Sequence, residues 1–215
     1  PIEYHIEGVN QVHANHKVGM TFARALRSIL RQDPDVIMVG EIRDAETADI
    51  AVKSALTGHL VFSSVHANDA PGTVTRLVDM GVPPYLVGSA VTLVMAQRLV
   101  RKICDRCKDS FTAEPEHVGA LGEDAEAVLG RQIARGRGCI ACKQTGYSGR
   151  SAVFEVLPVN KGVRRMVLDR LNEDEIKHKA VADGFMTLRK SGIRKVLDQA
   201  TTIEEIRSAT LSDHV

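Results

Sequence analysis

The sequence has almost no excess of charge: 28 lysines and arginines face 27 aspartates and glutamates among 215 residues, and the net charge is +1. There is therefore no overall electrostatic field that would favour nucleic acid or an anionic membrane as a partner. No apolar run approaches the 18 residues that a membrane-spanning helix needs. No N-terminal segment has the charged and then apolar pattern of a secretory signal. The 44% of apolar and 26% of charged residues are typical of a globular protein.

A phosphate-binding loop is also missing. None of the 17 glycines is followed by lysine, so the pattern G-x-x-x-x-G-K-[ST] does not occur in these 215 residues. That loop holds nucleotide phosphates through its backbone N–H groups and its lysine. The first residue is Pro1 rather than methionine, and we expect the sequence to be a fragment of a longer protein.

Cysteine is confined to two C-x-x-C pairs, Cys104 with Cys107 and Cys139 with Cys142. Without a secretory signal a reducing compartment is expected, where such pairs indicate a metal site rather than disulfides. Four thiolates can surround Zn²⁺ as a closed structural site. A redox-active C-x-x-C is the alternative. The glycine-rich flank "GCIACKQTGYSG", which could turn tightly around an ion, favours the metal.

Segments with helical periodicity alternate with short apolar runs in the first hundred residues. The predicted helices are 21–31, 44–58 and 68–81, and the predicted strands are 36–39 and 59–65. Because Val36–Val39 is continuously apolar, we expect its strand to be covered on both faces. Residues 84–100 are predicted to be largely helical, turning into a short strand near 98–103. This alternation indicates an α/β domain with a mainly parallel sheet.

The alternation ends near Cys104. Residues 104–149 hold the cysteines and many glycines, a strand is predicted at 149–159, and short helices are predicted over 160–210. We therefore expect three parts: 1–103 as the α/β part, 104–149 as a zinc-binding segment, and 150–215 as a helical subdomain.

Two polar side chains follow the two predicted strands directly. Glu41 lies two residues beyond Val39, and His66 follows Val65. Since ligands of parallel α/β sheets bind beyond the carboxyl ends of the strands, we expect both side chains at one rim. A carboxylate there can orient water or hold Mg²⁺, and an imidazole can contact a phosphate. His59 lies at the far end of its strand, where a structural role is favoured.

Glu41 also has a simpler interpretation. An acid that precedes a helix can serve only as the ion-pair partner of Arg43, and an apolar strand that ends in an acid is common. Asp44 is predicted to cap the helix that follows.

Longer motifs carry a resemblance to a family. The sequence resembles the C-terminal ATPase core of the secretion ATPases of type II secretion and type IV pilus assembly. "DPDVIMVGEIRD" is similar to their Walker B segment, "TGHLVFSSVHAND" to their histidine box, and "PIEY" to the end of their aspartate box. "AQRLVRKICDRC" and "GCIACKQTGYSGRSAVFEVLPV" are similar to the tetracysteine segment of the zinc-containing assembly type. The likeness extends to about residue 210.

The resemblance implies the C-terminal part of a RecA-like P-loop domain that acts on ATP with Mg²⁺. Glu41 would act on the attacking water and the metal ion, His66 would approach the γ-phosphate, and Glu3 would help to position Mg²⁺ or water. The histidine box also contains His59, which the resemblance makes a candidate cofactor-binding residue. Arg43 and Arg76 would serve as subunit-contact or charge-compensating residues at that site.

The family also implies partners. The intact protein would be a cytoplasmic homohexamer, peripheral at the inner membrane, that works with an inner-membrane platform and cytoplasmic assembly proteins. Its phosphate-binding loop would lie upstream of "PIEY", so this chain alone is expected to be inactive. Structural Zn²⁺ would be held by the four cysteines.

A zinc-ribbon module that binds nucleic acid is the alternative function. Residues 161–195 contain ten lysines and arginines against five acids, which keeps this alternative open. The same stretch has a single aromatic residue, Phe185, so base stacking has little support. We expect no nucleic-acid partner.

Overall fold

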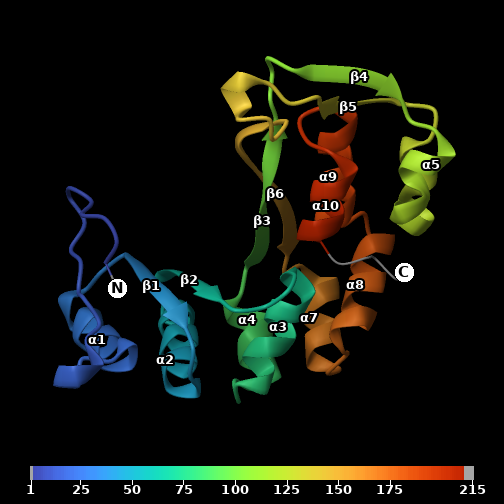
Figure 1. The fold of residues 1–215 in the computed structure, drawn as a ribbon. Coiled ribbons are helices and arrows are strands. Elements are labelled where there is room, and N and C mark those ends of the chain that lie inside the picture. Colours follow the sequence, from blue (N-terminus) through green and yellow to red (C-terminus); the bar gives the residue numbers. More distant parts are fainter. Residues whose placement is uncertain (1, 211–215) are drawn as a thin grey trace. The chain divides into compact units, whose positions relative to one another are not determined.

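The structure is a computed structural model that describes residues 2–210, with only the backbone of Ala120 and Glu123. Its residues form two compact units, one of Pro1–Val94 with Pro158–Lys177 and one of Met95–Leu157 with His178–Val215. Helices and strands are mixed in a single α/β chain (Figure 1). The division at 103 and 149 that the sequence predicts stays a prediction, and Pro1 and 211–215 lie outside the described residues.

The first unit contains two parallel strands and several helices. Its elements are η1 (His16–Val18), α1 (Phe22–Ile29), η2 (Leu30–Gln32), β1 (Val36–Ile42), α2 (Ala45–Leu56), β2 (Leu60–Val65), α3 (Ala70–Asp79), α4 (Pro84–Ala90) and α7 (Lys161–Leu168). The helices and strands predicted for residues 21–81 are thus confirmed. In Figure 1, α2 runs alongside β1 and β2, which it contacts.

Side chains that precede the helices explain where the helices begin. The Thr21 hydroxyl accepts a hydrogen bond from the Arg24 N–H, and a carboxylate oxygen of Asp44 accepts one from the Thr47 N–H at 2.7 Å. Asp69 caps α3 in the same way, through the Gly72 N–H. Each cap satisfies an N–H that has no partner inside its helix. The predicted capping role of Asp44 is confirmed.

The expectation that β1 is covered on both faces is wrong for the described residues. Burial alternates along the strand, with Ile37 2% exposed and Met38 78% exposed. Leu60 and Phe62 of β2 are also exposed. The reason is that α2 covers one face of the pair, whereas the described chain leaves large apolar side chains on the other. An apolar run shows that both faces suit burial, not that both are covered within one chain.

The prediction for 84–100 is also wrong in part. Helix α4 ends at Ala90, and β3 (Leu93–Ile103) begins five residues earlier than expected. Val91, Thr92 and Val94 are β-branched and favour extended backbone. The Val159 N–H donates to the Thr92 carbonyl at 2.9 Å, so a segment far along the chain pairs with this one. Pairing of that kind cannot be recognised from a local pattern.

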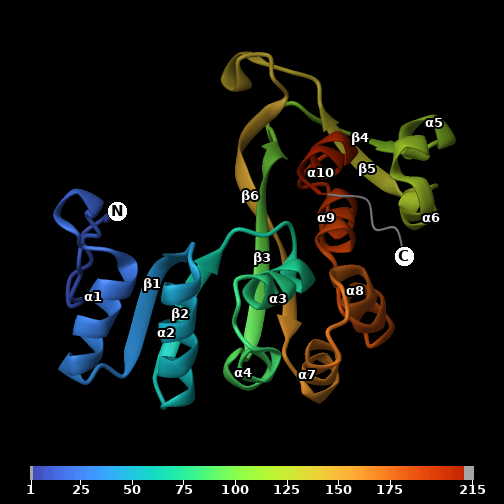
Figure 2. The same cartoon turned by 90° about the horizontal axis from the view of Figure 1, so that it is seen from below.

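The second unit is built from two pairs of strands and several short helices. Its elements, with β3, are β4 (Lys108–Thr112), α5 (Pro115–Val118), η3 (Gly119–Asp124), α6 (Ala125–Val128), β5 (Gln132–Gly136), η4 (Ile140–Cys142), β6 (Tyr147–Pro158), α9 (Leu188–Leu197) and α10 (Ile203–Ala209). Helix α8 (Glu173–Ala182) contains the boundary between the units. Strands β3 and β6 are neighbours in one sheet (Figure 2).

The core of this unit combines residues from the middle of the sequence with residues of the C-terminal helices. Val100, Val128, Val153, Val196 and Ile206 are all at most 1% exposed and belong to one cluster. Strands β4 and β5 pair antiparallel, with Lys108 opposite Gly136. The described sheets therefore include a parallel pair in the first unit and an antiparallel pair in the second. Among the helices of residues 2–210, none has the length and apolar character needed to cross a membrane.

Candidate active site and metal centre

Glu41 and His66 meet at the carboxyl ends of β1 and β2. The parallel register places Ile42 opposite Val65, so residues that end the two strands share one edge of the sheet. The register shifts between Val39 and Ile42, and this irregularity contains Glu41. The Nε2 atom of His66 lies 3.1 Å from Oε2 of Glu41. The structure thus brings together the acid and the imidazole that the sequence predicts at one rim.

Arg43 contacts the same carboxylate. Its Nε donates to Oε2 of Glu41 at 2.6 Å, and the Glu41 side chain is 15% exposed. The hydrogen bond from Arg43 lowers the pKa of Glu41; desolvation opposes this shift, and the contact with His66 supports it. Glu41 is therefore an ionised acceptor at neutral pH. The ion pair expected by the simpler interpretation is present, together with the contact to His66.

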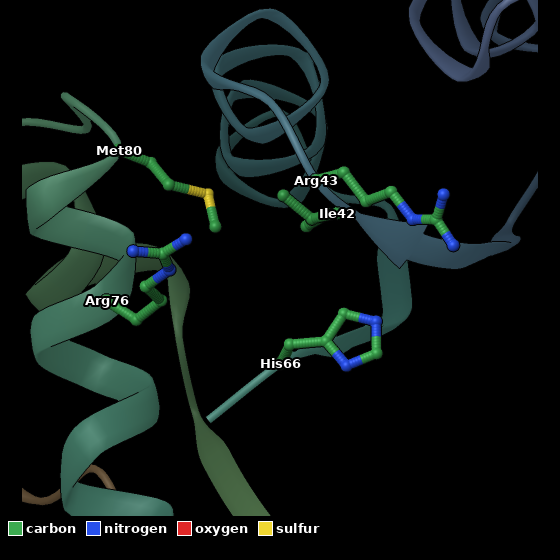
Figure 3. A pocket seen from close by; sticks show the side chains of 5 residues that line it. All are labelled: Ile42, Arg43, His66, Arg76 and Met80. Atoms are coloured by element: carbon green, nitrogen blue, oxygen red, sulfur yellow. The ribbon is translucent and has the colours of Figure 1, made fainter. Parts of the chain in front are cut away.

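A pocket of about 300 Å³ lies beside this pair, lined by Ile42, Arg43, His66, Arg76 and Met80. Figure 3 shows Arg76 on α3, Met80 directly after the last residue of that helix, and Arg43 and His66 at the ends of the strands. Two guanidinium groups and an imidazole suit an anion, because they offer several N–H donors to oxygen. Arg76 is thus near the site at which it was expected to compensate charge.

Sequence reasoning missed the apolar side of this pocket. Met80 caps the C-terminal end of α3, four residues after Arg76, so the two side chains lie on the same side of that helix. That spacing is the signal that could have found Met80 once Arg76 was chosen. Ser64 was missed as well: its hydroxyl donates to the Gly40 carbonyl at 2.8 Å and so ties β2 to the bend that precedes Glu41.

Two predicted residues are not brought to the rim. His59 lies before β2, at its other end, where Nδ1 is 3.0 Å from the Ser54 carbonyl oxygen and 3.3 Å from the Thr57 hydroxyl. These contacts fit the structural role that the strand position favours. Glu3 is exposed in the segment before α1, and the described hydrogen bonds and ion pairs of Glu41 do not involve it.

The four cysteines form one cluster. Sγ of Cys104 lies 4.0 Å from Sγ of Cys139, Cys107 lies 3.9 Å from Cys142, and Cys139 lies 3.7 Å from Cys142. A tetrahedral Zn²⁺ with bonds of about 2.3 Å would separate its sulfur ligands by about 3.8 Å. Disulfide bonds need sulfurs about 2.05 Å apart. The sulfur atoms are therefore spaced as ligands of one ion and not as bonded pairs.

Backbone groups around the cluster also favour ionised sulfur. Burial raises the pKa of Cys142, but the N–H groups of Cys139 and Gly146 donate to its sulfur and lower the pKa to about 6. Burial raises the pKa of Cys107 to about 12. A bound metal ion reverses such a rise, since coordinated thiols are deprotonated. The donor set thus fits Zn²⁺.

Glycine is required where the backbone segments around the cysteine cluster approach each other. A side chain at Gly136 would overlap the backbone of Gly146, and Gly146 itself has φ +77°. The Cys104 N–H donates to the Gly146 carbonyl at 2.9 Å, which joins the first C-x-x-C pair to the second. The glycine-rich flank therefore allows the close approach that the four sulfurs need.

The nucleic-acid alternative is not favoured by the named relatives. The sequence is 49% identical to type II secretion system protein E of Pseudomonas aeruginosa over 210 residues, which are 98% of this chain and 41% of that protein. It is 46% identical to the type IV pilus assembly ATPase PilB of Thermus thermophilus over 98% of this chain and 24% of that protein. The chain thus spans less than half the length of these relatives.

Solved structures of similar fold include a pilus retraction motor and an ATPase. The pilus retraction motor PilT with bound ADP is 25% identical, with a TM-score of 0.60 over 89% of this chain and 45% of that one. The ATPase DotB of Yersinia pseudotuberculosis, at 20% identity, shares the fold with a TM-score of 0.62 over 97% of this chain and 46% of that one. Residues 1–208 match the sequence model described as type II/IV secretion system protein. The chain belongs to the type II/IV secretion system protein family.

Proposed function

We propose that this chain is the C-terminal part of a motor ATPase that powers type IV pilus assembly or type II secretion. The observation that carries the proposal is the contact between Glu41 and His66 at the ends of two parallel strands, beside a pocket lined by arginines. Relatives named as a pilus assembly ATPase and a secretion protein, each at least 46% identical, support the choice of machine.

Glu41 is the acid of this site. An ionised carboxylate with a lowered pKa can accept a hydrogen bond from water and hold it in line for attack on a phosphate. His66 lies 3.1 Å from Glu41 and would reach the γ-phosphate. Mg²⁺, when bound with ATP, would neutralise the phosphate charge that develops during transfer. Arg43 and Arg76 would compensate charge around the pocket or contact a neighbouring subunit.

The contacts around Glu41 make up only part of an ATP site. The loop that holds the β- and γ-phosphates is absent from the 215 residues and would be supplied by another part of the protein. Glu3 would reach Mg²⁺ or water once that part is in place, and His59 would support the site from the other end of β2. The RecA-like arrangement of the complete domain belongs to the same proposal.

The cysteine cluster would hold a structural Zn²⁺. Cys104, Cys107, Cys139 and Cys142 have the number, chemistry and spacing of its ligands. The ion would cross-link a segment that has many glycines and few large core residues. Such a centre would favour the assembly type of motor over the retraction type.

The complete protein would be a homohexamer on the cytoplasmic side of the inner membrane. Its partners would be a membrane platform and cytoplasmic assembly proteins, and ATP hydrolysis would move one subunit against another. Net charge near zero gives no support to nucleic acid as a partner.

The central experiment measures ATP binding and turnover by the full-length protein that contains this chain. Glu41→Gln keeps the shape of the side chain but removes its charge, so binding should persist while turnover falls at least about a hundredfold. His66→Ala should also lower turnover. His59→Ala is the matched control, because its contacts indicate an effect chiefly on stability. Turnover by Glu41→Gln at the rate of the unchanged protein would refute the role given to Glu41.

A further inference from the structure

Positive charge is concentrated around the cysteine cluster. Five exposed cations lie within two residues of a cysteine in the sequence: Lys102, Arg106, Lys108, Arg137 and Lys143. The acids in the same positions are Asp105 and Asp109, and Asp109 is engaged by Arg137 at 2.7 Å and Arg135 at 3.6 Å. Because the four sulfur atoms lie within 4.8 Å of one another, the cations from both C-x-x-C pairs gather around one centre.

The metal centre accounts for part of this charge only. Four thiolates around Zn²⁺ carry a net charge of about −2, which two cations offset. Arg101 and Arg150 are exposed on the adjoining strands and add to the same region, although Arg101 is paired with Glu205. A surplus of positive charge thus remains after the acids and the thiolates are counted.

A strongly exposed apolar side chain lies in the same segment as this charge. Ile140 lies between Cys139 and Cys142 and is 91% exposed, more than any other large apolar residue described. Its backbone is held in place, since the Lys143 N–H donates to the Ile140 carbonyl at 3.1 Å and the Gln144 N–H donates to the Cys139 carbonyl at 2.9 Å. A rigid tip loses little conformational entropy when it is covered by a partner.

We propose that Ile140 and the five cations around it form a docking surface, the knuckle surface, for an acidic segment of a partner protein. Arginine binds carboxylates through paired hydrogen bonds, and a central apolar contact ringed by charges is the usual arrangement of a protein interface. The acidic segment would place an apolar side chain against Ile140 and its carboxylates against the surrounding cations.

Two other classes of partner fit the surface less well. Single-stranded nucleic acid is held by exposed aromatic faces, but Phe111 is covered by Arg135 at 5.2 Å and Tyr147 by Arg101 at 4.1 Å. A membrane surface is bound by an amphipathic helix with a broad apolar face. Here the apolar tip lies on η4, which is three residues long.

The test measures binding of the zinc-loaded chain to a fluorescent glutamate peptide with one central leucine, by anisotropy at low salt. The double variant Arg106→Glu/Lys143→Glu should weaken binding about tenfold, because attraction becomes repulsion at two positions. The control Lys190→Glu/Arg194→Glu makes the same change of net charge on α9 and should leave binding within about twofold. Ile140→Ser should weaken binding of this peptide and not of one without the leucine.

Zinc content and circular dichroism establish that each variant is folded before its affinity is compared. Equal weakening by the α9 control would overturn the proposal, since net charge alone would then explain the affinity. Absence of peptide binding would overturn it as well, whether or not the chain binds vesicles of anionic lipid or single-stranded DNA. Loss of binding after zinc removal is expected, because the tip depends on the cluster for its shape.

Discussion

The carboxylate of Glu41 is held by two neighbours through a single oxygen. Arg43 and His66 both approach Oε2, at 2.6 and 3.1 Å. Neither contact uses Oε1, which remains the oxygen of this carboxylate best placed for water or a metal ion. Arg43 thus has a defined physical role in this structure, which is to keep the acid ionised and oriented.

Replacing Arg43 by glutamine should raise the pKa of Glu41 toward its ordinary value of about 4.3. The hydrogen bond from Arg43 is the largest cause of the lowered pKa, and an uncharged amide cannot replace its charge. A pH titration of the Glu41 carboxyl carbon by NMR measures the shift. Arg27→Gln is the control, since Arg27 pairs with Glu46 instead. An unchanged titration curve in Arg43→Gln would contradict the assignment.

The same pair makes stability depend on pH in a defined direction. A group whose pKa is lower in the folded state contributes stability above its unfolded pKa, and this contribution is lost as the pH falls through the folded value. The Glu41 contribution is therefore present above the unfolded pKa of about 4.3 and is lost as the pH falls through the lower folded pKa. In Arg43→Gln this part of the acid sensitivity should be reduced.

Among the structural elements, those with local signals were predicted well. Thr21, Asp44 and Asp69 cap helices because the contact spans only three residues, and such contacts are visible in the sequence. Strand β3 was mistaken for helix over 93–97, because its extended form depends on a partner strand about sixty residues away. The start of β3 is therefore a tertiary effect.

The site also has parts that the sequence predicts and parts that depend on tertiary packing. Parallel strands bring their ends together, so the meeting of Glu41 and His66 could be predicted from the two strand positions alone. The two C-x-x-C pairs also predict, from their residue types and spacing, a single cluster of four cysteines. The pocket required α3 to be placed against the strand ends, and the sequence does not define that packing. Met80 was missed on that account.

Helix α10 contacts β3 and β6, the strands on either side of the cysteine segment. Arg101 at the end of β3 binds Glu205 through its guanidinium at 2.6 Å and its backbone N–H at 2.8 Å. The same guanidinium lies over the ring of Tyr147, whose hydroxyl is 3.0 Å from that of Thr202. Arg101 thus joins β3, β6 and α10.

Arg101→Ala should lower the free energy of unfolding of the second unit by about 1 kcal/mol, since it removes an ion pair and a cation–π contact together. Hydrogen exchange should accelerate in α10 more than in α9. Arg194→Ala, an exposed cation on α9, is the control and should change stability by less than about 0.5 kcal/mol. Unchanged exchange in α10 would show that the contact contributes nothing.

Loss of one cysteine should affect the second unit before the first. We expect about one Zn²⁺ per chain bound by four sulfurs, and Cys142→Ser should lose the ion and open residues 104–149 to protease. Ser148→Ala, near the start of β6, is the control and should keep the ion. Elemental analysis and limited proteolysis measure both effects. Metal-free protein with intact disulfides would contradict the assignment.

At the scale of the whole molecule, the proposed catalytic rim occurs without a phosphate-binding loop in the same 215 residues. The described chain has an acid, an imidazole and two arginines around a pocket, but its sequence has no lysine loop to position phosphates. Positioning supplies most of the catalysis in phosphoryl transfer. We therefore expect the rim by itself to be insufficient for turnover.

The 215-residue chain alone should not hydrolyse ATP. Calorimetric titration with ATP and Mg²⁺ should show weak or no binding, and a phosphate-release assay should show no steady turnover. The full-length protein, assayed in parallel, is the positive control. Micromolar binding or turnover by the chain alone would reveal a phosphate site among residues that we have not assigned.

The exposed face of β1 and β2 has one further consequence, which is chemical. Met38 is 78% exposed on that face, so its thioether is open to peroxide. Oxidation to the sulfoxide would turn an apolar side chain into a polar one in the middle of a surface suited to burial. The rate at which Met38 is oxidised thus reports whether that face is covered, and mass spectrometry can compare the rate in this chain with that in the full-length protein.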